Sequence, residues 1–242
     1  MISKQAIMGH LVLGYPNLET SYQTAKKYVE AGIKYLELQI PFSHPTADGV
    51  VITNANRQAI HINNVTVADC LELMKRLHLE YPKQQIVPMT YLNKIVGFGI
   101  DNFLKALEAL AIENLIVPDL PFDAREAQVI HASSVKLVPV IAPNITKDRI
   151  HLALVHKPNL VYIMSDYKIT GYGFGIHQNM EASIAQIRSH SDAQIGIGFV
   201  ITTAADVKQI LAIADFSIVG SVLIKAEEQH MLAKKLSELV SE

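Results

Sequence analysis

The sequence lacks several features that would each indicate a particular class of protein. Its 242 residues include one cysteine, Cys70, so a disulfide within the chain is excluded. Cys70 lies in an apolar, periodic segment, which is typical of a small buried side chain. This composition fits a reducing compartment, and we expect the cytoplasm. No apolar run reaches the roughly 18 residues that a membrane helix needs, and the first residues lack the apolar core of a signal peptide. We therefore expect no membrane association.

An excess of charge of one sign is also missing. The chain has 21 Lys and Arg residues against 23 Asp and Glu residues, which gives a net charge of −2. These residues are dispersed along the chain, so no nucleic-acid-binding surface is predicted. An anionic substrate remains compatible with this balance, because backbone amides alone can hold a phosphate group.

Patterns that would indicate a metal or a nucleotide cofactor are absent as well. The 10 histidines do not cluster, and no His/Glu or His/Cys spacing indicates zinc. His10, in the first expected strand, and His44, in the loop after the second, are therefore interpreted as pocket or surface residues. No Gly-x-Gly-x-x-Gly fingerprint follows the first expected strand, so a dinucleotide is not predicted. We expect neither a metal nor a cofactor.

What the sequence does contain is a regular alternation of short apolar runs with longer amphipathic segments. Strands are expected at Gly9–Leu13, Tyr35–Ile40, Ile86–Tyr91, Asn114–Val117, Val135–Ile141, Leu160–Met164, Ile195–Phe199 and Phe216–Val219. Helices are expected at Leu18–Ala31, Asn54–Ile60, Val65–Leu79, Ile100–Leu110, Asp123–Ser133, Lys147–His156, Met180–His190, Ala204–Ile213 and Ile224–Val240.

This alternation predicts parallel βαβ units, and eight of them predict closure into a (β/α)8 TIM barrel of the α/β class. No linker or change of composition marks a boundary, so residues 1–242 are expected to form a single TIM-barrel domain. A flavodoxin-like open sheet is the alternative, but such sheets normally have about five strands.

The second expected strand and the loop after it carry two acids. Glu37 and Gln39 share one face of this apolar strand, since strand side chains alternate with a period of two. Burial of a carboxylate in a strand destabilises the fold unless the group is paired, so an unpaired one indicates a function. A carboxylate shielded from water is suited to general acid–base catalysis. Asp48 follows eleven positions after Glu37, directly before Gly49. In a barrel, both acids would lie at the carboxyl ends of the strands, where active sites are built.

Each acid also has a purely structural interpretation. Glu37 could be paired with a lysine or a tyrosine in the core. Asp48 could be an ordinary turn residue, because Asp-Gly is a common turn pair.

Glycines end the last two expected strands. Gly198 and Gly220 allow backbone amides to approach a ligand closely, and Ser221 begins the segment that leads into the last helix. Barrels often bind a phosphate at this position, although Gly220-Ser221 alone could be a helix cap. The loop 165–179 is a candidate lid, because long loops are usually functional, and a mobile insertion without a role is the alternative.

The two-acid segment resembles the signature of the tryptophan synthase α subunit family. The match comprises Leu36-Glu37-Leu38, Ile40-Pro41-Phe42-Ser43, Pro45, Ala47-Asp48-Gly49 and Asn54-Ala55-Asn56. Further motifs extend the resemblance along nearly the whole chain: Leu13-Gly14-Tyr15-Pro16, Thr90-Tyr91-Leu92-Asn93, Val117-Pro118-Asp119-Leu120-Pro121, Ile169-Thr170-Gly171, Gly198-Phe199 and Val219-Gly220-Ser221.

The resemblance implies a lyase of tryptophan biosynthesis that cleaves indole-3-glycerol phosphate to indole and glyceraldehyde 3-phosphate. Glu37 would be the acid/base that protonates indole C3, and Asp48 would stabilise the positive charge that develops at the indole N–H. No metal or cofactor is implied for this subunit. The family works with a pyridoxal-phosphate β subunit, so an α2β2 heterotetramer is expected, with the loop around His44 at the interface.

The resemblance also implies the remaining site residues. Tyr162 would position Glu37 or the substrate, and Thr170 would close the lid over Asp48. The indole slot would be lined by Ile52, Leu115 and Phe199, with Tyr91 as a further substrate-binding residue. The phosphate would be held by Gly171, Gly198, Val200, Gly220 and Ser221.

Some positions depart from the family pattern. Gln39 stands where the family usually has glycine, His44 replaces the usual aspartate, and Val200 replaces a glycine whose amide faces the phosphate. These departures motivate a second hypothesis, an α-like subunit with weak or no activity that binds and regulates a β partner. A third hypothesis is another phosphate-binding barrel enzyme, such as an isomerase.

Overall fold

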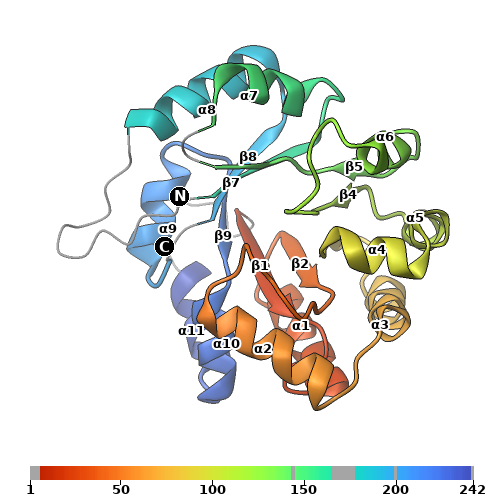
Figure 1. Ribbon diagram of the computed structural model, residues 1–242. Helices are drawn as coiled ribbons and strands as arrows, with labels where there is room; N and C mark the ends of the chain where they lie inside the picture. Colours follow the sequence, from red (N-terminus) through yellow and green to blue (C-terminus); the bar gives the residue numbers. More distant parts are fainter. Residues whose placement is uncertain (1–5, 143–144, 165–177, 199–200, 241–242) are drawn as a thin grey trace.

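The computed structural model describes residues 6–142, 145–164, 178–198 and 201–240. Its strands form a ring that is surrounded by helices (Figure 1). The strands are β1 (Ile7–Val12), β2 (Tyr35–Gln39), β3 (Gln85–Met89), β4 (Asn114–Leu115), β5 (Lys136–Leu137), β6 (Val140–Ile141), β7 (Leu160–Met164), β8 (Gln194–Gly198) and β9 (Phe216–Val219). The helices are α1 (Leu18–Glu30), α2 (Val50–His61), α3 (Val67–Glu80), α4 (Leu92–Phe98), α5 (Ile100–Ala109), α6 (Arg125–His131), α7 (Lys147–Leu154), α8 (Gln178–His190), α9 (Ala204–Leu211), α10 (Ser221–Glu228) and α11 (Leu232–Val240).

All strand pairs are parallel, and together they close the ring. Seven strands follow the order β3-β2-β1-β9-β8-β7-β6, while β4 pairs with β5. A parallel bridge between Met89 and Ile116 joins β3 to β4. Because β5 and β6 are consecutive in the chain, the two sheets form one closed barrel, and the predicted (β/α)8 fold is confirmed.

The fifth expected strand, Val135–Ile141, is divided into β5 and β6. Pro139 lies in the gap and has no N–H to donate, so the regular ladder is interrupted there. Hydrogen bonds nevertheless continue on both sides: Val138 N donates to Leu115 O at 2.8 Å, and Tyr162 N donates to Pro139 O at 2.9 Å. The two pieces therefore act as one strand of the barrel.

Three helix predictions need correction. The segment between β3 and Gly99 forms α4, which was not predicted; the helix ends at Phe98 and is capped by Gly99, whose φ is 93°. Helix α2 begins at Val50 rather than Asn54. The expected last helix, Ile224–Val240, is divided into α10 and α11, with a left-handed residue, His230 (φ 56°), between them. These breaks depend on single backbone conformations that an amphipathic pattern does not specify.

The apolar side chains form two layers, one inside the barrel and one between the barrel and the helices. The interior layer includes Met8, Tyr35 and Phe216, and the rings of Tyr35 and Phe216 lie 5.0 Å apart. Met8 is opposite Tyr35 in the β1–β2 register, and His10 is opposite Glu37. Because side chains alternate along a strand, His10 and Glu37 lie on the same inner face, one layer nearer the carboxyl ends.

Gly196 is expected to be indispensable for packing of the interior layer. A Cβ atom at this position would overlap the ring of Phe216, which is 1% exposed. Gly196→Ala should therefore lower the free energy of unfolding by about 1–3 kcal/mol, measured by urea denaturation. The matched control is Gly97→Ala in α4, where a Cβ would meet no atom within 4 Å. Equal stability of the two variants would contradict this prediction.

None of the helices in the described part of the chain is both long and apolar enough to cross a bilayer.

Candidate active site

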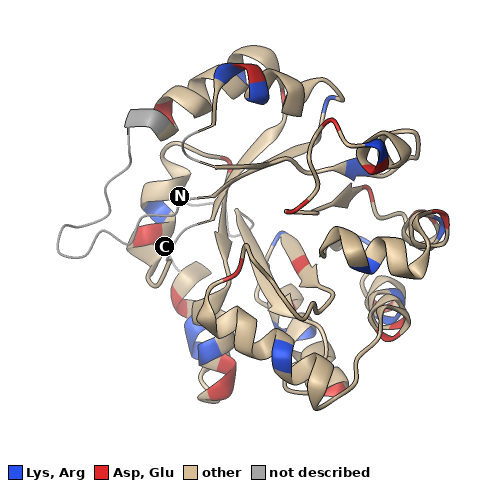
Figure 2. Cartoon of the chain, viewed as in Figure 1, with Lys and Arg blue, Asp and Glu red and all other residues tan. Residues whose placement is uncertain are grey.

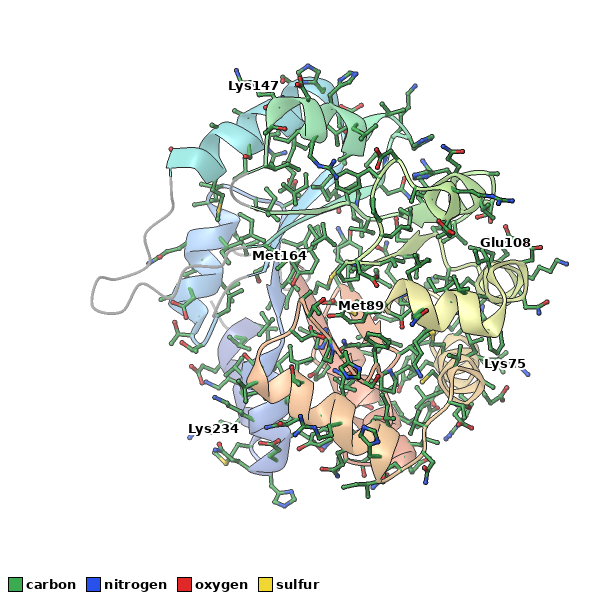
Figure 3. All side chains as sticks on the ribbon, viewed as in Figure 1. Lys75, Met89, Glu108, Lys147, Met164 and Lys234 are labelled. Carbon is green, nitrogen blue, oxygen red and sulfur yellow. The ribbon has the colours of Figure 1, made fainter. Side chains whose placement is uncertain are left out.

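A cavity of about 230 Å³ opens at the carboxyl ends of the barrel strands. Figure 3 shows Met89 and Met164, two of its lining residues, towards the middle of the ring, whereas Lys75 and Glu108 lie at the periphery. The described residues that line it are His10, Glu37, Ala47, Asp48, Gly49, Ile52, Met89, Ile116, Pro118, Val140, Tyr162, Met164, Gly198, Ile218, Gly220 and Ser221. The structure thus brings both predicted acids to one cavity, at the end of the barrel where the sequence places them.

Glu37 lies on β2 and is paired with His10 on β1. His10 Nδ1 is 3.3 Å from Glu37 Oε1, and both residues are almost fully buried. The sequence suggested a lysine or a tyrosine as a structural partner for Glu37, whereas the structure provides a histidine. The other polar atom of each side chain, Glu37 Oε2 and His10 Nε2, has no hydrogen-bond partner in the described part of the chain.

Burial alone would lower the pKa of His10, but the carboxylate of Glu37, and then that of Asp48, raises it, so that the pKa lies above its usual value. The charged imidazolium is thereby favoured next to two acids. The sequence showed His10 in the first strand but did not reveal this pairing, which depends on the register of β1 and β2.

The raised pKa of His10 predicts a pH-dependent stability. A histidine whose pKa is higher in the folded than in the unfolded chain stabilises the fold fully below about pH 6.5, and this contribution is lost as the pH rises through the folded-state pKa. The difference in unfolding free energy between wild type and His10→Asn should therefore be larger at pH 6 than at pH 8.5. The exposed His61, replaced in His61→Asn, is the control, and a pH-independent difference for His10→Asn would contradict the prediction.

Asp48, in the loop between β2 and α2, is held by two side chains. Gln39 Nε2 donates to Asp48 Oδ2 at 2.7 Å, and the Tyr91 hydroxyl donates to the same oxygen at 3.2 Å. Burial raises the pKa of Asp48 above its ordinary value, while His10 and the hydrogen bond from Gln39 oppose that shift. These contacts fix the carboxylate of Asp48, which lines the cavity.

Gln39 is in turn fixed by Asn56 of α2. Asn56 Nδ2 donates to Gln39 Oε1 at 3.2 Å, and Asn56 Oδ1 accepts from Phe42 N at 2.8 Å. Gln39 and Asn56 are both fully buried. The sequence placed Gln39 on the same strand face as Glu37 and marked it as a departure from the family pattern, but it assigned Gln39 no role in the site.

Tyr162 lies on β7 and lines the same cavity. Burial raises the pKa of its hydroxyl, and the nearby Glu37 and Asp48 raise it further, so the phenol stays neutral. A Cβ atom at Gly198 would overlap this hydroxyl, so only glycine leaves room for Tyr162 here.

Two predicted phosphate-binding residues that follow the last strand line the same cavity. Gly220 precedes α10, Ser221 is its first residue, and both line the cavity together with Gly198. The first amides of a helix lack intrahelical partners and favour anions. Ile52 of α2 lies beside Gly220, where a Cβ would be 3.5 Å from Ile52 Cδ1.

Two other predicted substrate-binding residues lie elsewhere. Leu115 is buried in the layer between barrel and helices, while its neighbour Ile116 lines the cavity, because successive side chains point to opposite faces. Tyr91 does not line the cavity; it supports Asp48 and stacks on Phe42 at 4.8 Å between ring centroids. The predictions for Thr170, Gly171, Phe199 and Val200 fall outside the described residues.

Lysine and arginine residues lie mostly on the outer helices, as Figure 2 shows, and none lines the cavity within the described ranges. In the same ranges, no group of three or more His, Cys, Asp or Glu side chains is arranged to hold a metal ion.

The fold and the cavity define a (β/α)8-barrel protein with an acidic site at the mouth of the barrel, beside a helix N-terminus. A sequence model of the tryptophan synthase alpha chain family matches residues 2–241. The chain belongs to this family, which comprises lyases of tryptophan biosynthesis.

Individual relatives agree with this assignment. The chain is 32% identical to the tryptophan synthase alpha chain of Chloroflexus aggregans over 234 residues, which cover 96% of this chain and 87% of the relative. It is 31% identical to that of Syntrophotalea carbinolica over 225 residues, with 92% and 88% covered. Among solved structures, a chain of Mycobacterium tuberculosis tryptophan synthase superposes with a TM-score of 0.87 at 28% identity, covering 98% of this chain and 91% of that one.

Proposed function

We propose that this protein cleaves indole-3-glycerol phosphate to indole and glyceraldehyde 3-phosphate. The observation that carries the proposal is the placement of two separately held carboxylates, Glu37 and Asp48, in one cavity with the N-terminus of α10. One acid has a free oxygen for proton transfer, the other is oriented by hydrogen bonds, and the helix end can take a phosphate.

The chemistry requires a proton to be delivered and a proton to be removed. Protonation at indole C3 makes the ring a leaving group, and loss of the adjacent hydroxyl proton allows the carbon–carbon bond to break with formation of the aldehyde. Glu37 is assigned to this proton transfer, because its Oε2 is buried and unpartnered in the cavity while Oε1 is occupied by His10.

Asp48 is assigned to charge stabilisation. Positive charge develops on the indole nitrogen once C3 is protonated, and a fixed carboxylate facing the N–H would lower the energy of that state. Gln39 and Tyr91 keep the carboxylate in one orientation, so little reorganisation is needed during the reaction. The apolar side chains of Ile52, Met89 and Ile116 provide walls suited to a flat ring.

The partner proposed for this chain is a tryptophan synthase β subunit, in an α2β2 assembly. The family assignment supports this, as does the exposed character of His44 in the loop after β2 and of Val50 at the start of α2. Mixing the chain with a recombinant β subunit should give a complex of the mass of two α and two β chains in multi-angle light scattering. Separate elution of the two proteins would contradict the assembly.

The test of the reaction is indole release from indole-3-glycerol phosphate by the purified chain, alone and with a β subunit. Release in either sample above the level of matched Glu37→Gln and Asp48→Asn samples supports the lyase. Failure to exceed those variants, combined with stimulation of the β reaction, would instead favour a regulatory α-like subunit. Turnover only of a phosphate ester without an indole ring would favour another barrel enzyme.

A further inference from the structure

His10 lies where the acid pair and the proposed phosphate end of the cavity meet. Its Nδ1 atom faces Glu37 Oε1 at 3.3 Å. Its opposite edge faces the start of α10: a Cβ at Gly220 would be 3.6 Å from His10 Cδ2, the carbon bonded to Nε2. The residue is 4% exposed, and Nε2 has no hydrogen-bond partner in the described part of the chain.

A buried ring nitrogen without a partner is costly, so a site that retains one is expected to satisfy it with a ligand. The cavity bordered by His10 is the space available for such a ligand. The neighbouring Gly220 carries no side chain that would fill the space beside the imidazole edge.

The charges around the cavity narrow the choice of ligand group. Two carboxylates, Glu37 and Asp48, line it, and His10 is the one lining side chain within the described ranges that can carry a positive charge. A phosphate ester entering beside two acids would be repelled unless a cation or oriented donors compensate.

We propose that His10 is a substrate-binding residue whose imidazolium, held by Glu37 through Nδ1, donates its Nε2–H to an oxygen of the substrate's glycerol phosphate tail. This inference rests on the proposed function for the identity of the substrate. It extends that function, because it adds a cationic side chain to a phosphate site otherwise made of backbone amides. The contact between His10 Nδ1 and Glu37 Oε1 leaves Glu37 Oε2 as the oxygen that can exchange a proton with the substrate.

The titratable groups that face His10 are Glu37 from β2, Asp48 from the β2–α2 loop and the neutral Tyr162 from β7, and the uncharged amide of Gln39 from β2 also lies close to the ring. Ile218 of β9 and the start of α10 add no titratable side chain on their side. On the outer side, the Tyr28 hydroxyl of α1 donates to the backbone oxygen of His10 at 3.2 Å and does not reach the ring.

Two substitutions of His10 distinguish the contribution of its Nδ1 donor, which faces Glu37, from that of its Nε2 donor. In His10→Asn the side-chain amide can replace the donor towards Glu37 but does not reach the Nε2 position. In His10→Gln the longer side chain can replace the Nε2 donor without its charge. Both variants are compared with wild type for binding of glycerol 3-phosphate and of indole by isothermal titration calorimetry, with melting temperatures as the folding control.

At pH 6.5, His10→Asn should bind glycerol 3-phosphate about ten- to hundredfold more weakly than wild type, because a hydrogen bond from a charged donor is lost. Indole affinity should change less than about twofold, the level expected where no direct contact is lost. His10→Gln should recover part of the loss. The ratio of wild-type to His10→Asn affinity should fall towards one as the pH rises from 7 to 9, since the charge on His10 is lost, while the phosphate, whose second pKa is about 6, is already mostly a dianion throughout this range.

An unchanged affinity in His10→Asn, a ratio that stays constant with pH, or no wild-type binding of glycerol 3-phosphate would overturn the inference. These outcomes are distinct from failure of the proposed reaction. Indole release by wild type together with unaffected binding in His10→Asn rejects the role of His10 alone. Binding that depends on His10, without any indole release, rejects the lyase reaction and leaves the anion-binding role of His10 in place.

Discussion

Glu37→Gln is expected to reduce kcat for indole release by about 10²- to 10⁴-fold, the range contributed by a general acid–base group. Glutamine has nearly the same shape as glutamate but neither accepts nor delivers a proton at neutral pH. Its amide oxygen can still accept a hydrogen bond from His10 Nδ1, so the fold and the β1–β2 contact should persist. Indole formed under saturating indole-3-glycerol phosphate is the measured quantity.

Two further variants test whether the lower rate of Glu37→Gln is caused by loss of the titratable group at this position. Glu72→Gln removes an exposed carboxylate that pairs with Lys75 on α3, far from the cavity, and should leave the rate unchanged. Glu37→Asp keeps the titratable group but withdraws it by one methylene, so an intermediate rate is expected. If Glu37→Gln turned over at the wild-type rate, proton transfer would have to be assigned to another group.

Asp48→Asn is expected to lower kcat/KM by about 10²- to 10³-fold, as is typical when one group that stabilises developing charge is removed. The asparagine oxygen can still accept hydrogen bonds from Gln39 and Tyr91, so the main change is the loss of the negative charge that is proposed to face the indole N–H. The melting temperature should therefore stay close to that of wild type while the catalytic rate falls.

The side chains that hold Asp48 provide a graded comparison. Tyr91→Phe removes one hydrogen bond to the carboxylate and should reduce kcat/KM by about three- to tenfold, the effect of one neutral hydrogen bond. Gln39→Met removes the shorter bond and also leaves Asn56 Nδ2 with only Ile52 O as acceptor, so a larger loss of kcat/KM and a lower stability are expected.

Wild-type rates in Asp48→Asn would contradict the charge-stabilising role of Asp48. Equal losses of kcat/KM in Asp48→Asn and Tyr91→Phe would indicate that the orientation of the carboxylate, rather than its charge, is decisive.

Much of the architecture follows from the sequence alone, because its causes are local. The alternation of apolar runs with amphipathic segments predicts parallel βαβ units, and the number of units predicts closure of the barrel. The placement of Glu37 and Asp48 at one end of the barrel has the same origin. Glu37 lies in the strand that stops before Pro41, and Asp48 lies in the loop that follows it, so both acids come to the carboxyl end. For the same reason Gly220 and Ser221 were expected beside them.

Other features depend on contacts between segments far apart in the chain. The pairing of His10 with Glu37 requires the observed register of β1 and β2, which no periodicity within either strand specifies. Leu115 was expected at the substrate site, but its neighbour Ile116 lines the cavity instead, because adjacent strand residues point to opposite faces.

The support of Asp48 also depends on tertiary structure. The loop after β2 must turn back over the strand end before Gln39 can reach the carboxylate, and α2 must pack against the barrel before Asn56 can reach Gln39. The sequence by itself therefore determined the barrel, the two acids and the end of the barrel at which they lie. The tertiary structure decided which side chains hold those acids and which single histidine faces both the acid pair and the start of α10, because hydrogen bonds across strands are set by register and packing rather than by local pattern.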